Sequence, residues 1–226
     1  MRLGVLFSGG KDSVFALHEA AEKEEVACLI TLISENTESY MFHTPNIAVT
    51  SLQAKAINLP LVQKETAGNP ESELIDLEAA IAQAVKAYKI EGVVSGAIES
   101  VYQSERIQRI CNSLGVWCFN PLWKRNQKAI LEEIVAKSYK VIISGVFAYP
   151  LDSKWLGKEL NTEVIRKLLR LEEEFSLSPS GEGGEIETTV LDAPLFKKKI
   201  EIFEHEVEAK GNSGVYKIKK ARLKAK

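Results

Sequence analysis

The sequence predicts an α/β protein: a parallel sheet with helices on both faces, followed by a smaller C-terminal lobe that contains a β-hairpin. Short apolar runs alternate with helically spaced segments up to about residue 150, which favours a parallel sheet. Beyond that point, alternation of period two surrounds a Gly-Asn-Ser-Gly turn, which is typical of an antiparallel hairpin. We therefore expect two domains, residues 1–125 and 126–226.

The elements of the first domain follow from the spacing of apolar residues. Leu3–Phe7 is apolar, too short for a helix, and runs into Ser-Gly-Gly, so it is predicted to be a buried strand. The next segment has Val14, Leu17, Ala20 and Ala21 at helical spacing. The same criteria predict strands at 26–33, from 61 onward, at 92–98 and at 116–119, and helices at 13–25, 51–59, 71–88 and 101–114.

The second domain begins with a helix expected from about 127 to 138 and a sixth strand at 140–147. The strand–helix alternation by itself would add this strand to the parallel sheet. A helix from about 162 to 175 and a loop rich in glycine and glutamate at 178–187 come next, and the hairpin strands are expected at 200–205 and 215–218. Since ligands of parallel sheets bind at the carboxyl ends of the strands, the loops after the first and fourth strands are where a site is expected.

Composition narrows the class of protein. The chain has 226 residues, 45% hydrophobic and 27% charged, as is ordinary for a globular protein. No apolar run is long enough to span a membrane, and the N-terminus runs directly into a strand without room for a cleavable signal, so we expect a cytoplasmic protein with no membrane partner. The cysteine count is odd and no CxxC occurs, which argues against disulfides and structural zinc.

Charge is uneven along the chain. The net charge of −2 argues against general binding of polyanions. The segment 217–226 is nonetheless rich in Lys and Arg. It is either a solvated strand face with a frayed tail or a docking surface for RNA, the ribosome or an acidic protein.

A glycine turn separates the first strand from the first helix. Its two glycines permit a tight turn and expose backbone N–H groups, and a helix N-terminus is a favourable seat for phosphate oxygens. Lys11 adds a positive charge, and Asp12 suits Mg²⁺ or a helix cap. The spacing differs from that of the GxxxxGK[ST] loop. A capped strand-to-helix turn without a ligand is the alternative to a phosphate site formed by Ser8, Gly9, Gly10, Lys11, Asp12 and Ser13.

This string resembles the SGGxDS signature of the PP-loop, or N-type ATP pyrophosphatase, superfamily. The resemblance implies a HUP-type (adenine nucleotide alpha hydrolase-like) domain and cleavage of ATP between its α- and β-phosphates, with pyrophosphate seated in the loop. ATP and Mg²⁺ are then the expected cofactors. Lys11 and Asp12 become candidate catalytic residues, and Asp12 becomes the candidate metal ligand.

Four further segments resemble the diphthine–ammonia ligase family in its short archaeal form: 41–44, 99–106, 153–160 and 181–188. The resemblance runs from residue 2 to about residue 196. It implies that ATP adenylates the carboxylate of diphthine, a trimethylammonio-carboxypropyl histidine on elongation factor 2. Ammonia would then displace AMP to give diphthamide. The chain shows no glutaminase half, so free ammonium is the expected nitrogen source.

The segment Gly181–Thr188 places three carboxylates among three glycines, which suits a cation: trimethylammonium, ammonium or Mg²⁺. A flexible acidic surface loop is the alternative. Glu187 is the catalytic candidate here, and His43 and Gly96 are candidates for nucleotide binding. An exposed helix face is the alternative for Tyr102, Gln103 and Arg106, and a place in the core is the alternative for Trp155. The full set of substrate-binding candidates is Tyr102, Gln103, Arg106, Trp155, Gly183, Gly184, Glu185 and Glu187.

Two other functions remain open at this point. One is another PP-loop ATP pyrophosphatase, such as a tRNA-modifying ligase. Such enzymes usually carry RNA-binding modules or cysteine pairs that this sequence lacks, so a nucleic-acid partner is not expected. The other is a protein that binds ATP without turnover. The expected partners are diphthine-bearing elongation factor 2 and ammonium, and a homo-oligomer is left open.

Overall fold

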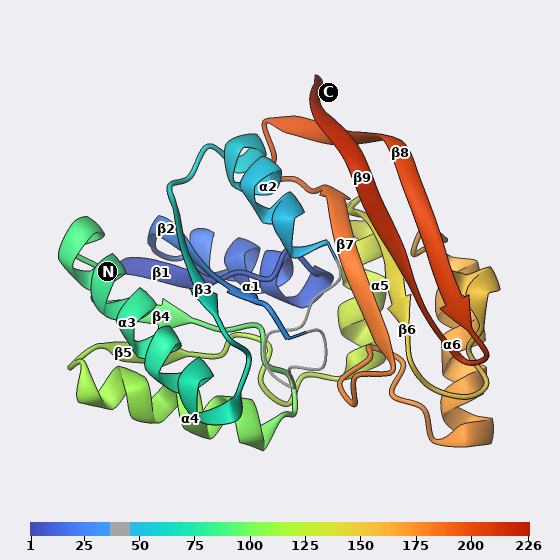
Figure 1. Cartoon of the computed structure of the whole chain (residues 1–226), viewed down its shortest axis with the longest axis horizontal. Helices are drawn as coiled ribbons and strands as arrows, with labels where there is room; N and C mark the ends of the chain where they lie inside the picture. The colour runs from blue at the N-terminus through green and yellow to red at the C-terminus, as the bar shows by residue number, and fades with distance from the viewer. Residues whose placement is uncertain (37–45) are drawn as a thin grey trace.

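The computed structural model describes residues 1–36 and 46–226, which form two sheets (Figure 1). The first sheet is parallel, with strand order β3-β2-β1-β4-β5, and the second is antiparallel, with order β7-β6-β9-β8. Helices lie against both faces of the parallel sheet, so the predicted fold class is confirmed.

The parallel sheet has β1 at its centre, with β2 and β3 on one side and β4 and β5 on the other. The direction of winding therefore reverses between β1 and β4, and ligands of such sheets bind at the carboxyl ends beside this point. The elements are β1 (Arg2–Leu6), α1 (Lys11–Ala21), β2 (Glu25–Ser34), η1 (Ile47–Val49), α2 (Thr50–Ile57), β3 (Leu61–Thr66), α3 (Pro70–Tyr88), β4 (Gly92–Val94), α4 (Val101–Ser113) and β5 (Trp117–Phe119).

Two apolar clusters hold the layers together. One lies between the parallel sheet and α3 and α4 and includes Leu77, Ile81 and Ile107. The other joins α1 and the opposite face of this sheet to the second sheet, and includes Phe15 and Val190. The second cluster is continuous across both sheets, so the two parts of the chain share one core.

The second part of the chain begins at α5 and ends at a long hairpin. Its elements are α5 (Gln127–Ala136), β6 (Lys140–Val146), η2 (Ser153–Trp155), α6 (Thr162–Phe175), β7 (Ile186–Asp192), β8 (Lys198–Lys210) and β9 (Ser213–Ala225). Asparagine side chains cap the two helices: Asn126 accepts from the Ala129 N–H and Asn161 from the Val164 N–H, at 3.0 and 2.9 Å. Caps of this kind stabilise a helix by about 1 kcal/mol.

Several elements differ from expectation. The fourth strand, β4, ends at Val94, four residues before the predicted end, and the hairpin strands β8 and β9 are each 13 residues long, well beyond the predicted 200–205 and 215–218. The sixth strand, β6, pairs antiparallel with β7 and β9 and does not join the parallel sheet. β7 itself was not predicted, and because it begins at Ile186, Glu187 lies in a strand and not in a loop. Helix α1 begins at Lys11, two residues before the predicted start, so Lys11 and Asp12 belong to its first turn.

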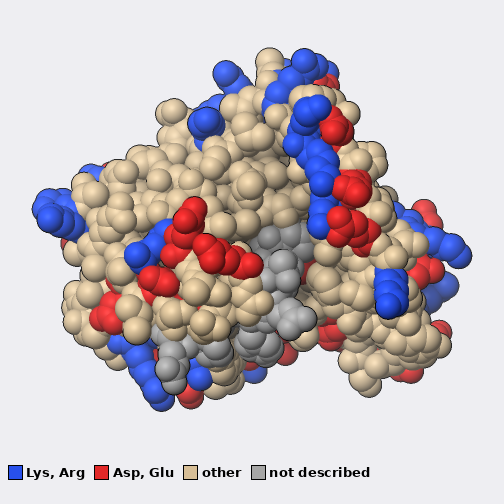
Figure 2. Space-filling model, viewed as in Figure 1, with Lys and Arg blue, Asp and Glu red and all other residues tan. Residues whose placement is uncertain are grey.

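The basic segment 217–226 forms most of β9, where its charges are paired. Lys217 contacts Glu208 at 2.5 Å and Lys219 contacts Glu206 at 2.7 Å, across the hairpin from β8. Arg222 contacts Glu201 in the same way, at 2.7 Å. In Figure 2, blue and red side chains run next to each other along this hairpin. The surface therefore alternates in charge, and the excess of positive charge seen in the sequence is largely balanced by β8.

In the part of the chain that the structure describes, no helix is long and apolar enough to cross a membrane.

Candidate active site

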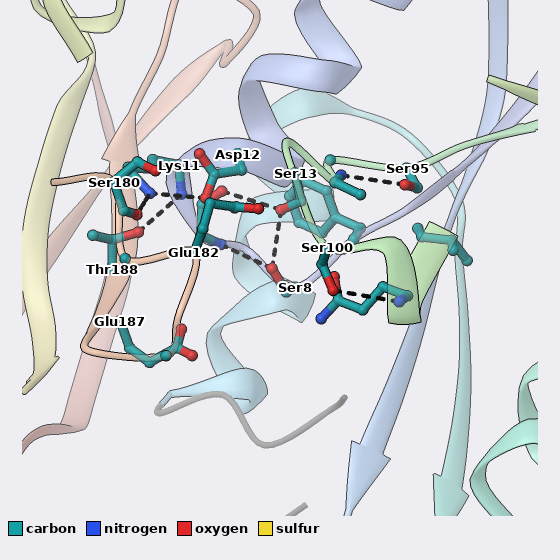
Figure 3. A pocket seen from close by; sticks show the side chains of 18 of the residues that line it. Ser8, Lys11, Asp12, Ser13, Ser95, Ser100, Ser180, Glu182, Glu187 and Thr188 are labelled. Atoms are coloured by element: carbon teal, nitrogen blue, oxygen red, sulfur yellow. Dashed lines mark hydrogen bonds and ion pairs between the residues drawn. The ribbon is translucent and has the colours of Figure 1, made fainter. Parts of the chain in front are cut away.

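A cavity of about 500 Å³ opens at the carboxyl ends of β1 and β4, where the two sheets meet (Figure 3). The loop after β1, the loop after β4 and the segment leading into β7 all contribute to its wall. Polar and glycine residues on this wall are Ser8, Gly10, Lys11, Asp12, Ser13, Ser95, Gly96, Ser100, Gln103, Ser180, Gly181, Glu182, Gly183, Gly184, Glu187 and Thr188. Its volume is in the range of pockets that hold small-molecule ligands.

The glycine loop after β1 has the geometry of an anion site. The N-cap of α1 is Gly10, which has no side chain to cap the helix, and Gly10, Lys11, Asp12 and Ser13 at this helix end all line the cavity. The Ser8 hydroxyl donates to the Ser13 hydroxyl at 3.2 Å, which places both beside this end. A Cβ on Gly96 would lie 2.9 Å from the Asp12 carbonyl carbon, so only glycine lets the β4 loop approach so closely.

The loop is also tied to β7 of the second sheet. The Gly9 carbonyl accepts from the Val190 N–H at 3.0 Å and from the Gln53 amide at 2.8 Å. The same amide nitrogen donates to the Val190 carbonyl at 2.8 Å, and the Lys11 N–H donates to the Thr188 hydroxyl at 3.1 Å. Gln53 is fully buried. The glycine loop and β7 are therefore held in one register.

Lys11 and Asp12 form an ion pair in which the lysine side chain is buried and the aspartate side chain is partly exposed. The Lys11 ammonium group, 3% exposed, donates to an Asp12 carboxylate oxygen at 2.8 Å and to the Ser180 carbonyl. The other Asp12 oxygen is buried and has no hydrogen-bond partner among the described residues. A buried, unpartnered carboxylate oxygen is a fit for a cation.

A magnesium ion bound here would take most of its ligands from phosphate and water. Among the described residues, no group of three or more His, Cys, Asp and Glu side chains is arranged to hold a metal. Mg²⁺ commonly uses only one or two carboxylates together with substrate phosphates. Asp12 alone therefore fits Mg²⁺ that arrives with a nucleotide.

Two further carboxyl groups have perturbed acidity. Burial is the main cause that raises the pKa of Glu187 to about 7, against a lowering effect of the Lys11 charge and with a smaller raising effect of the Asp12 charge. Burial and the Asp12 charge also raise the pKa of Glu182, although its carboxylate accepts the Glu99 N–H at 2.9 Å. The cavity thus concentrates negative charge that a cationic ligand would relieve.

Most of the sequence-predicted residues meet at this cavity. Ten of them line it: Ser8, Gly10, Lys11, Asp12, Ser13, Gly96, Gln103, Gly183, Gly184 and Glu187. Gly9 supports the loop from behind, with a positive φ of 78° and the Gln53 side chain against it. The candidate His43 lies outside the described residues.

Four candidates are not on the described cavity wall. The Arg106 guanidinium stacks on the Tyr102 ring, 3.3 Å from its centroid, one turn along α4. Glu185 accepts the N–H groups of Ser178 and Gly183, so it shapes the glycine-rich loop. Trp155 packs against the core of the second sheet.

Glu182 is one of the three carboxylates of the glycine-rich segment that the sequence suggested for a cation, and it does line the cavity. Sequence reasoning missed three other residues that the structure brings to the loop. Thr188 ends the glycine-rich segment, but its motif gave this residue no role. Ser180 lies just before that segment. Gln53 lies in α2, where a single glutamine carries no signal of its role, because the carbonyls it contacts come from residues 44 and 137 positions away.

Fold and site together define an α/β protein with a cavity and a glycine loop at the switch point of its parallel sheet. The family model for the diphthamide synthase N-terminal domain matches residues 1–118, and that for the diphthamide synthase C-terminal domain matches residues 126–223. The chain belongs to the diphthamide synthase family.

Curated relatives bear the name diphthine–ammonia ligase. The mouse protein is 37% identical over 88% of this chain and 82% of its own length, and the human protein 33% over 92% and 85%. The fission yeast protein is 36% identical over all of this chain, which spans only 40% of that relative. A crystal structure described as a predicted subunit of a tRNA methyltransferase from Methanocaldococcus jannaschii is similar at TM-score 0.42 and 15% identity, over 86% of this chain and 98% of its own; a likeness this distant adds nothing to the assignment.

Proposed function

We propose that this chain is a diphthine–ammonia ligase, which uses ATP to amidate diphthine on elongation factor 2. Family membership and the names of its relatives support the reaction. The observation that carries the proposal is the cavity itself. The glycine loop and the Glu187 carboxyl line the same cavity of about 500 Å³, which supports the binding of ATP and the diphthine side chain at one site.

In the proposed first step, the diphthine carboxylate attacks the α-phosphorus of ATP and pyrophosphate leaves. The N-terminus of α1 and the hydroxyls of Ser8 and Ser13 would hold the outer phosphates, where negative charge develops. Lys11 would stabilise the same charge from its buried position beside Asp12, and Mg²⁺ on Asp12 would neutralise phosphate oxygens. The product of this step is an acyl-adenylate, which needs no general base to form.

In the proposed second step, ammonia attacks the acyl carbon and AMP leaves. The nitrogen arrives as ammonium, so a proton must be removed before it becomes a nucleophile. Glu187 is suited to accept that proton because a carboxyl group with a pKa of about 7 is much more basic than an ordinary glutamate. Its carboxylate form would also attract ammonium, or the trimethylammonium of diphthine, into the cavity.

The direct test supplies purified protein with ATP, Mg²⁺, ammonium and diphthine-bearing elongation factor 2. AMP, pyrophosphate and the amide on the elongation factor should form in equal amounts, as chromatography and mass spectrometry would show. Asp12→Asn should lower the rate by about a hundredfold or more, since it removes a charge at the reacting phosphates. ADP in place of AMP would overturn the proposal.

The two alternatives predict other outcomes. A tRNA-modifying ligase would consume ATP with bulk tRNA and ignore the elongation factor. A protein that only binds ATP would have a higher thermal midpoint in the presence of ATP but would release no pyrophosphate.

A further inference from the structure

An aromatic patch continues from the cavity wall onto the surface of the second domain. Phe147, directly after β6, lines the cavity and is still 38% exposed. Two residues further on, Tyr149 is 68% exposed, and its ring meets that of Phe175 edge to face, with the centroids 5.4 Å apart. Phe175, the last residue of α6, is 42% exposed. Clustered exposed aromatic rings are typical of sites where another macromolecule binds.

The helix end beside this patch carries unfavourable charge. Glu172, Glu173 and Glu174 are exposed in the last turn of α6, and no basic residue occupies that turn. Carboxylates at a helix C-terminus destabilise it, because they face the negative end of the helix dipole. A cationic partner at this position would offset that cost.

From these observations we propose that the patch formed by Phe147, Tyr149 and Phe175, with the acidic last turn of α6, is the docking surface for the protein substrate. The inference rests on the proposed function, which requires a macromolecular substrate to present its reacting carboxylate in the cavity. The surface fits a segment with apolar and basic side chains, since exposed rings bury the former and carboxylates pair with the latter. Because Phe147 lines the cavity and Tyr149 follows it by only two residues, a segment bound to this patch would lie near the cavity.

The test compares Tyr149→Ala and Phe175→Ala with the control Trp117→Ala. Trp117 is 67% exposed on β5, far from α6 in Figure 1. Both patch variants should raise the KM for diphthine-bearing elongation factor 2 by about tenfold, the effect of losing an interface anchor. Their Kd for ATP, measured by calorimetry, should stay within about twofold of wild type, as should both constants of the control.

A second variant replaces Glu172, Glu173 and Glu174 with Gln. Removing charge from the negative end of the helix dipole should raise the thermal midpoint, while the KM for the elongation factor should also rise. If these glutamates affected only the stability of the helix, the thermal midpoint would rise while the KM for the elongation factor stayed unchanged. An unchanged KM in either aromatic variant or in this triple variant would overturn the proposal.

Failure of the proposed function would show itself differently. Wild-type protein would then form no amide, whereas a wrong docking surface leaves wild-type turnover intact and the variants unchanged. Direct binding of the elongation factor, measured without ATP, follows the same variants and depends on the docking surface alone.

Discussion

At the scale of single residues, the unusual groups are acids that share a confined space. Asp12 has one oxygen on Lys11 and one that is buried and unpartnered among the described residues, while burial raises the pKa of Glu187 to about 7, so that this carboxyl is only partly ionised at neutral pH. Such groups cost stability in a protein without ligands. A cation bound in the cavity, or a proton transferred there during the reaction, would offset this cost and explain why the groups are present.

Glu187→Gln tests this at one position. The folded pKa of about 7 lies above the ordinary value of 4.5, so wild type loses stability as pH rises from about 4.5 to about 7 and keeps that penalty above it. The amide cannot ionise, so the variant should be more stable than wild type at pH 8, by on the order of 1–3 kcal/mol, and not at pH 4. Denaturant unfolding at both values measures this.

The same variant should lose most of its ligase activity. Wild-type rate should rise with pH through a transition near 7, as Glu187 becomes able to accept a proton, and the variant should lack that transition. Glu185→Gln is the control, since its carboxylate bonds within the glycine-rich loop. A Glu187→Gln enzyme with wild-type rate and pH profile would remove this residue from the mechanism.

At the scale of elements, β7 is the strand that unites the site. It pairs with β6, binds the phosphate loop through Thr188 and Val190, and carries Glu187 between them. Gln53 from α2 joins this arrangement with two hydrogen bonds from one buried amide nitrogen. Because buried amides are costly to leave unpaired, this contact specifies a single register of loop and strand.

Gln53→Ala should loosen that register. The loss of two buried hydrogen bonds should lower stability by about 2–3 kcal/mol. It should also raise the KM for ATP more than it lowers kcat, because Gln53 supports the phosphate loop without touching the cavity. Gln108→Ala, an exposed glutamine on α4, serves as the control. Wild-type ATP affinity in Gln53→Ala would show that the loop holds its shape without this contact.

At the scale of the whole molecule, the long hairpin β8–β9 of the second sheet carries a row of ion pairs between its two strands. Each basic side chain of β9 that pairs with an acidic side chain of β8 has its charge partly neutralised, which weakens its attraction for a polyanion. The basic residues of β9 therefore do not form a uniformly basic face on the side of the hairpin that Figure 2 shows, where acidic side chains lie beside them.

Binding to bulk tRNA should therefore be weak at physiological salt. Replacing Glu201, Glu204, Glu206 and Glu208 with Gln would expose the β9 charges and should increase tRNA affinity by about tenfold or more at low salt, with a steeper salt dependence. Filter binding at several salt concentrations measures both. Tight tRNA binding by the wild type that persists at high salt would contradict this account.

How much the sequence could predict depends on the range of the interaction. The alternation of short apolar runs with helices predicted the parallel sheet correctly, and a glycine pair after the first strand correctly marked a wall of the cavity. The sheet membership of β6 was not predictable in this way, because its partner β7 comes forty residues later and has no alternation of its own. The contact of Lys11 with the Ser180 carbonyl, 169 residues away, could not be predicted for the same reason.

By itself, the sequence determined the class of fold, the position of the glycine loop on the cavity wall and the family, since all three follow from local spacing and short motifs. Only the tertiary structure decided which carboxyl groups share the cavity, which strand holds the loop in register and which acidic residues pair with the basic C-terminal segment. The physical reason is that pKa values, buried hydrogen bonds and ion pairs depend on neighbours brought together by folding, often more than a hundred residues apart in the chain.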